Sequence, residues 1–160
     1  MRTLSFAVAI AVGCLFAAVA AVAQDRNFHA HLTGAEEVPP VATQAQGQAI
    51  FQLSRDGMLI HYRLNVANIE DVTQAHIHLG PAGTNGPVVV WLYPSAPPAV
   101  LIPGRFQGVL AAGVITEANL VGQLAGQTLT DLLEHMKNGD TYVNVHTLAH
   151  PSGEIRGQIR

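Results

Sequence analysis

The sequence predicts an all-β domain: an antiparallel β-sandwich or barrel that carries one short helix. Most segments alternate apolar and polar residues, which is typical of half-buried strands. Residues that favour turns recur about every 8 to 12 positions, as in small sandwiches and barrels. Only one segment has the apolar spacing of an amphipathic helix. The 160 residues are enough for one domain and too few for two of ordinary size.

The first segment, residues 1–23, is predicted to be a cleaved signal peptide. It contains one early basic residue, Arg2, then an apolar run, and it ends in small residues at Ala23. A retained membrane anchor is the alternative, but no basic stop-transfer segment follows the run. We therefore expect a secreted or periplasmic mature domain at residues 24–160. The one cysteine, Cys14, lies in the signal, so this domain has no disulfide.

The expected strands are separated by clear turn and loop signals. Two consecutive prolines place an extended loop at residues 35–43, and Asp56-Gly57 is typical of a tight hairpin turn. A proline-rich connection follows at residues 94–104. In chain order, the strands are NFHAHLTG (27–34), GQAIFQLS (47–54), LIHYRLNVANI (59–69), TQAHIHLG (73–80), PVVVWLY (87–93), GRFQGVL (104–110), TYVNVHTL (141–148) and GEIRGQIR (153–160).

The expected helix lies within TLTDLLEHMKNG, residues 128–139. Thr128 is a typical N-cap, and Asp131 stands three residues further on, as in a capping box. Gly139 is expected to end the helix in the left-handed conformation. The apolar residues that would share one side of this helix are Leu132, Leu133 and Met136.

Composition argues against several classes of function. The formal net charge is −3 and no basic run exists, so we expect neither nucleic acid nor an anionic membrane surface as a partner. The mature chain has no nucleophile elbow and no cysteine nucleophile. Glu36 and Glu37 are consecutive, so their side chains should diverge rather than act together on one substrate. The residues thus favour a non-catalytic binding module, although they leave catalysis, the partner and the oligomeric state open.

Histidine is used unusually often, with eight residues in the chain. His76 and His78 are one residue apart on an expected strand, and the residues that alternate with them are apolar. His146 has the same phase on another expected strand. If the two strands are neighbours, the three imidazoles converge on one polar sheet face.

Such a cluster would suit a copper or zinc ion, because imidazole is a common ligand of both metals. The alternative function is therefore a copper-type protein that stores or carries metal, or performs redox chemistry, at His76, His78 and His146. Asn144, Glu154 and Arg156 share the polar phase and are candidates to orient the histidine rings. The alternative is that these histidines are solvated side chains on an exposed sheet face.

The other histidines favour less specific interpretations. His29 and His31 form a second His-x-His pair, expected to lie exposed on an edge strand. His61, His135 and His150 are expected to be solvated, on a strand, on the helix and in a turn respectively.

Three sequence blocks together resemble a known family. They read HLTGAEEVPPV, AHIHLGPAGTNGPVVV and YVNVHTLAHPSGEIRGQI, in that order along the chain. These blocks resemble the successive signature blocks of the CHRD domain, named after chordin, and the resemblance covers about residues 27 to 160.

The resemblance implies an all-β sandwich of the Greek-key type, like immunoglobulin or superoxide dismutase domains. It implies a binding role, since the animal protein with several such domains binds growth factors. The family's histidines correspond to His76, His78 and His146, whereas His29 and His31 have no counterpart. The His-x-His strand is also similar to that of copper–zinc superoxide dismutase, but the cysteines and zinc-loop ligands of that family are missing.

Overall fold

The computed structural model describes residues 26–160, so the expected signal segment at residues 1–23 lies outside the described residues. The described chain forms seven strands, one α-helix and three short 3-10 helices. The elements are β1 (Asn27–Thr33), η1 (Gly34–Glu36), β2 (Gln46–Leu53), β3 (Ile60–Leu79), β4 (Val88–Tyr93), β5 (Ile102–Ile115), η2 (Glu117–Asn119), η3 (Gly122–Leu124), α1 (Leu129–Asn138), β6 (Thr141–Thr147) and β7 (Ile155–Gln158).

All strand pairs are antiparallel, and five of the strands close into a barrel. The ring runs β1, β2, β3, β6, β7 and back to β1, while β4 and β5 pair with the free sides of β3. Next to the closing pair, the His29 amide donates to the Arg160 carbonyl at 2.8 Å and the Arg160 amide donates back at 2.9 Å. The expected all-β antiparallel fold with one helix is confirmed. Its hydrogen bonding joins the strands continuously around the ring.

The long strand β3 differs from the sequence prediction, which placed two separate strands at residues 59–69 and 73–80. The structure has one strand of 20 residues that bends in the middle. Asn68 and Asp71 have φ values of 54° and 51°, and the pairing register shifts around them. Asn and Asp tolerate this left-handed region better than other residues with a side chain. The bulges shift the alternation, which explains why the sequence indicated a break.

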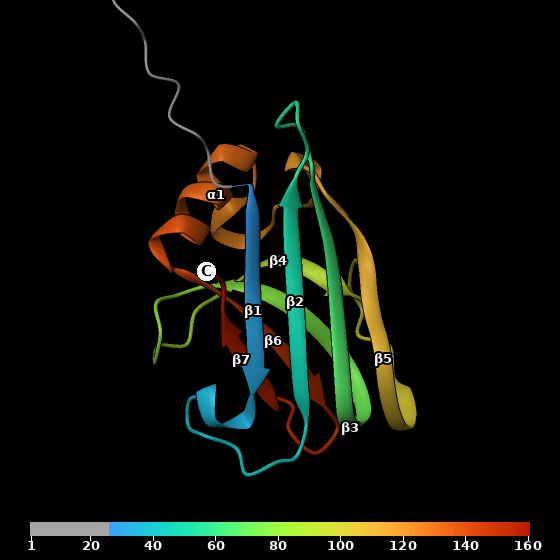
Figure 1. Cartoon of the computed structure of the whole chain (residues 1–160). Coiled ribbons are helices and arrows are strands. Elements are labelled where there is room, and N and C mark those ends of the chain that lie inside the picture. The colour runs from blue at the N-terminus through green and yellow to red at the C-terminus, as the bar shows by residue number, and fades with distance from the viewer. Residues whose placement is uncertain (1–25) are drawn as a thin grey trace, which may run out of the picture.

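This bend lets β3 belong to both sides of the barrel. Its first half lies between β2 and β5, and its second half lies between β6 and β4. The second half carries the His-x-His pair, so the bend places that pair against β6. In Figure 1, β1, β2 and the first half of β3 lie in front, and β6 and β7 run behind them.

The helix α1 confirms the predicted caps. The Thr128 amide donates to Asp131 Oδ2 at 2.8 Å, and the Asp131 amide donates to Thr128 Oγ1 at 3.3 Å. Gly139 has a φ of 72° and its amide donates to the carbonyls of the last turn. The buried apolar residues of α1 join the main core, so the helix packs against one end of the barrel (Figure 1). They are Leu129, Leu132, Leu133 and Met136.

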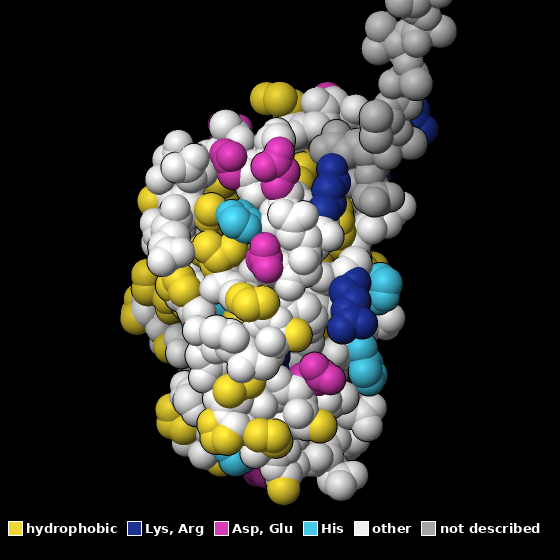
Figure 2. Space-filling model, turned by 90° about the vertical axis from the view of Figure 1, so that its left-hand side faces the viewer, with side chains coloured by type: hydrophobic (Ala, Val, Ile, Leu, Met, Phe, Trp, Pro, Cys, Tyr) yellow, Lys and Arg dark blue, Asp and Glu magenta, His cyan; other side chains and the backbone are white. Residues whose placement is uncertain are grey.

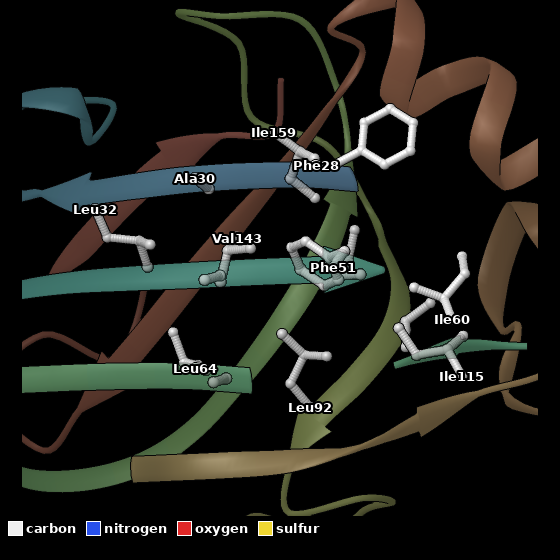
Figure 3. Packing of buried hydrophobic residues seen from close by; sticks show 14 of the residues in the cluster. Phe28, Ala30, Leu32, Phe51, Ile60, Leu64, Leu92, Ile115, Val143 and Ile159 are labelled. Atoms are coloured by element: carbon white, nitrogen blue, oxygen red, sulfur yellow. The ribbon is translucent and has the colours of Figure 1, made fainter. Parts of the chain in front are cut away.

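The hydrophobic core fills the space between the two sides of the barrel. Figure 3 shows side chains from β1, β2 and β3 pointing toward those of β4, β6 and the segment after β7. The strands β1 and β2 alternate strictly between exposed and buried residues, as their sequences predict. By contrast, all seven residues of β6 are buried, so both faces of this strand are covered.

The exterior has few charged side chains. On the face that Figure 2 shows, those of the described residues are scattered among apolar and neutral polar ones and form no continuous patch of either sign. Among the described residues, no helix is both long and apolar enough to span a membrane.

Gly157 of β7 lies close against the backbone of β1. A Cβ atom added there would lie 2.2 Å from the carbonyl oxygen of His31, which is backbone and cannot move aside. We expect Gly157→Ala to lower the free energy of unfolding by about 3 kcal/mol, which is the upper end of the usual cost of adding atoms to a well-packed site. Gly83→Ala is the comparison, because Gly83 has a φ of 76° but open space around it. That substitution should cost only about 1 kcal/mol. Equal urea midpoints for the two variants would contradict the conclusion that a side chain at position 157 clashes with the backbone of β1.

Candidate metal centre

The pairing of β3 with β6 brings the three predicted histidines together. His76 is in register with Asn144, and the preceding polar position of β3, Gln74, is in register with His146. The ring centroid of His76 lies 5.5 Å from that of His78 and 5.0 Å from that of His146. One ring nitrogen from each histidine lies within 4.8 Å of the others. The predicted convergence of these strands and side chains is therefore confirmed.

The sheet face that carries these histidines is covered rather than solvated. The exposed fractions of His76, His78 and His146 are 2%, 8% and 6%. Three loops, at residues 34–45, 80–87 and 148–154, supply hydrogen-bond partners to side chains on this face. We call this face, with its loops, the covered polar face. The alternative that the sequence left open, that these histidines are solvated on an exposed sheet face, is wrong.

Backbone carbonyls fix the protonation of two of the rings. His78 Nδ1 donates to the Gly86 carbonyl at 2.9 Å, and His146 Nδ1 donates to the Pro151 carbonyl at 3.0 Å. Because a carbonyl can only accept, both Nδ1 atoms carry the proton and both Nε2 atoms carry the lone pair. Metal-binding histidines are commonly held in this way, by a hydrogen bond from the nitrogen that does not bind the ion.

The third ring lies against one of these lone pairs: because His146 Nε2 can only accept, His76 Nδ1 carries the proton between them when no ion is bound. His76 Nδ1 lies 3.2 Å from His146 Nε2. Two ligands about 2.0 to 2.1 Å from one tetrahedral ion are separated by about 3.3 Å, so this pair already has a suitable spacing. The Nε2 atoms of His76 and His78 are buried and have no hydrogen-bond partner. A buried polar atom without a partner costs about 1 to 3 kcal/mol, and a bound ion would remove that cost at a ligating atom.

Aromatic side chains pack against the imidazole rings of His76 and His78. The Trp91 ring meets the edge of His76 with centroids 4.2 Å apart. The Tyr142 ring is stacked on His78 at 4.9 Å, and the guanidinium carbon of Arg156 lies 3.4 Å from the centroid of Tyr142. These contacts restrict ring rotation in the metal-free protein.

Burial also determines the charge of the cluster. It lowers the pKa of His76 to about 3, with a smaller contribution from the neighbouring imidazoles, and it lowers the pKa of His78 to about 4. Burial lowers the pKa of His146 as well. The three rings are therefore neutral at pH 7, which is the form that binds metals.

The three polar residues predicted to orient the rings form hydrogen bonds with other partners. Asn144 Nδ2 donates to Glu37 Oε2 at 3.3 Å. Glu154 accepts from the hydroxyls of Thr43 and Thr147, each at 2.7 Å. Arg156 donates to the loop at residues 80–87. Its acceptors there are the Pro81 carbonyl, the Thr84 carbonyl and Asn85 Oδ1.

Glu37 is the residue that sequence reasoning missed. It belongs to the acidic pair set aside because the two side chains should diverge, and they do diverge: Glu36 is exposed, whereas Glu37 is only 5% exposed. Burial raises the pKa of Glu37 to about 7, although the positive charge of Arg156 acts in the opposite direction. Alternation carries no signal for this residue, because it lies in a loop rather than on a strand.

The remaining histidines lie outside the cluster. His29 and His31 are exposed as expected, but β1 pairs on both sides, so the prediction of an edge strand is wrong. His61 is exposed on the same outer face. His135 and His150 are half-buried, so both are less exposed than expected.

Comparison with known proteins agrees with the sequence blocks. The family model described as the CHRD domain matches residues 28–159, which is nearly the whole described chain. No solved structure gives a significant match to the chain. The three loops of the covered polar face and all three clustered histidines lie inside the matched region. The chain therefore belongs to the CHRD domain family.

Proposed function

We propose that this protein is an exported CHRD-domain binding module that holds one copper-type metal ion at His76, His78 and His146. The observation that carries the proposal is the set of buried lone pairs: two tautomers fixed by carbonyls, and a third ring 3.2 Å from one of them. Three imidazoles suit copper, and zinc is the alternative. Family membership supports a binding role.

Burial favours holding a metal over catalysis on a substrate. The three histidines are 2% to 8% exposed, so a molecule larger than the ion itself has little room to reach it. Export is proposed from the signal-like segment at residues 1–23, and it would expose the protein to copper outside the cytoplasm.

We expect purified wild-type protein to bind one equivalent of Cu(II) and the single variants His78→Ala and His146→Ala to lose at least about 100-fold in affinity. The loss is large because each substitution removes a directly coordinating atom. Metal content after dialysis gives the stoichiometry. Trp91 is the only tryptophan and touches His76, so quenching of its fluorescence by Cu(II) gives the affinity.

His61→Ala is the matched control, because His61 is an exposed strand histidine and should leave copper binding unchanged. Circular dichroism checks that each variant is folded. If His78→Ala does not fold, His78→Gln keeps a polar side chain and serves in its place. Copper affinity that is unchanged in both His78→Ala and His146→Ala would contradict the proposal. An equally large loss of copper affinity in His61→Ala would also contradict it.

A further inference from the structure

Asn144 lies on β6 next to the histidine cluster. It is directly in register with His76 across the β3–β6 pair, and on its own strand it lies between Tyr142, in register with His78, and His146. It is 2% exposed. Asn144 is therefore the neighbour of His76 across the strand pair and of His146 along β6. The Asn144 side chain shares their face of the sheet.

The oxygen of this side chain has no partner. Among residues 26–160, six buried side-chain polar atoms have no hydrogen bond, and four of them belong to the covered polar face. These four are Glu37 Oε1, His76 Nε2, His78 Nε2 and Asn144 Oδ1. Isolated polar atoms of this kind are rare in native proteins, because each costs about 1 to 3 kcal/mol. All four lie on the covered polar face, where a cation would give polar atoms of this kind a partner.

Glu37 determines which end of the Asn144 amide is free. Its Oε2 accepts from Asn144 Nδ2 at 3.3 Å, so the amide nitrogen is engaged and the oxygen is left over. Gly153 allows this approach: a Cβ there would lie 2.4 Å from Asn144 Oδ1 and 2.6 Å from Glu37 Oε1. The loop at residues 34–45 thus contacts the Asn144 carboxamide of β6 through the Glu37 carboxylate.

We propose that the Asn144 carboxamide oxygen is a fourth protein ligand of the ion, and that Glu37 is the positioning residue that turns this oxygen toward it. The inference rests on the proposed function. Three imidazoles with one weakly bound neutral oxygen form a set that copper accepts, since amide or backbone oxygens serve as long axial ligands in copper sites. Glu37 acts through Asn144 and does not itself touch the ion.

The test compares Cu(II) bound to wild type, Asn144→Leu and Asn144→Asp. Asn144→Leu keeps the branched shape of the side chain but removes the oxygen, so we expect copper to remain bound by the histidines with affinity reduced about tenfold. The electron paramagnetic resonance spectrum should change in its parallel hyperfine splitting, because the ligand set has changed. Asn144→Asp, with an anionic oxygen at the same position, should bind copper more tightly than wild type.

Glu37→Gln tests the positioning role, with Glu36→Gln as the matched control from the exposed neighbour. We expect Glu37→Gln to shift the Cu(II) spectrum toward that of Asn144→Leu, whereas Glu36→Gln should leave it unchanged. A spectrum is decisive because a merely structural role would lower stability without altering the copper signal.

The outcomes separate the two proposals. If wild type binds copper and the spectra and affinities of both Asn144 variants equal those of wild type, the inference fails and the three-histidine site stands. If wild type binds no copper, both fail. Should Asn144→Leu not fold, Asn144→Asp and Glu37→Gln decide the question, and an unchanged spectrum in both overturns the inference.

Discussion

Replacing Arg156 with methionine should lower the free energy of unfolding by about 4 kcal/mol. Arg156 is 1% exposed, and its guanidinium donates three hydrogen bonds to the loop at residues 80–87. It also lies over the Tyr142 ring and opposes the buried charge of Glu37. Removing one member of a buried charged network typically costs about 3 to 5 kcal/mol, because the remaining polar groups lose their partners.

Urea denaturation of the metal-free protein measures this change. Arg63→Met is the matched control: Arg63 is an exposed strand arginine whose hydrogen bond joins exposed side chains, so its loss should change stability by less than about 0.5 kcal/mol. Arg156→Lys should recover little, because an ammonium cannot reproduce the planar set of donors. A loss below about 1 kcal/mol in Arg156→Met would show that the loop is held by other contacts.

Acid should destabilise the metal-free protein through its buried histidines. Their pKa values in the folded state lie below the ordinary value of about 6.5, so protonation favours the unfolded chain. Above pH 6.5 these histidines do not reduce the free energy of unfolding. Below pH 6.5 the free energy of unfolding decreases as the pH falls toward the pKa values of the folded state, about 3 for His76 and about 4 for His78. At pH 5 each of these two residues accounts for a loss of about 2 kcal/mol.

Glu37 opposes this loss over part of the same range. Its pKa in the folded state is raised to about 7 from 4.5, so the fold favours the protonated carboxyl. Stability from Glu37 is therefore present at low pH and is lost as the pH rises from 4.5 to 7. Between pH 7 and pH 5 this group returns about 2 kcal/mol, which offsets one histidine.

The two contributions can be separated by measuring the free energy of unfolding from pH 7 to pH 4. Between pH 7 and pH 5, Glu37→Gln should lose about 2 kcal/mol more than wild type, because the compensating group is gone. Glu36→Gln should follow the wild-type curve. Parallel curves for wild type and Glu37→Gln would show that Glu37 does not titrate in this range.

The elements that depend on local patterns were predictable from the sequence. Thr128 and Gly139 bound the helix as predicted, because capping depends on residues only a few positions apart. The phase of His76, His78 and His146 was also correct, since alternation on a strand fixes which side chains share a face. The continuity of β3 was missed because bulges at Asn68 and Asp71 shift that alternation.

What the sequence by itself determined is therefore the strands, the helix and the common face of three histidines. Only the tertiary structure decided that this face is covered and that Glu37 reaches it to contact Asn144. The physical reason is that covering depends on loops, which carry no periodicity. Their positions follow from the closure of β1 on β7 and from the carbonyl and guanidinium contacts made across distant parts of the chain.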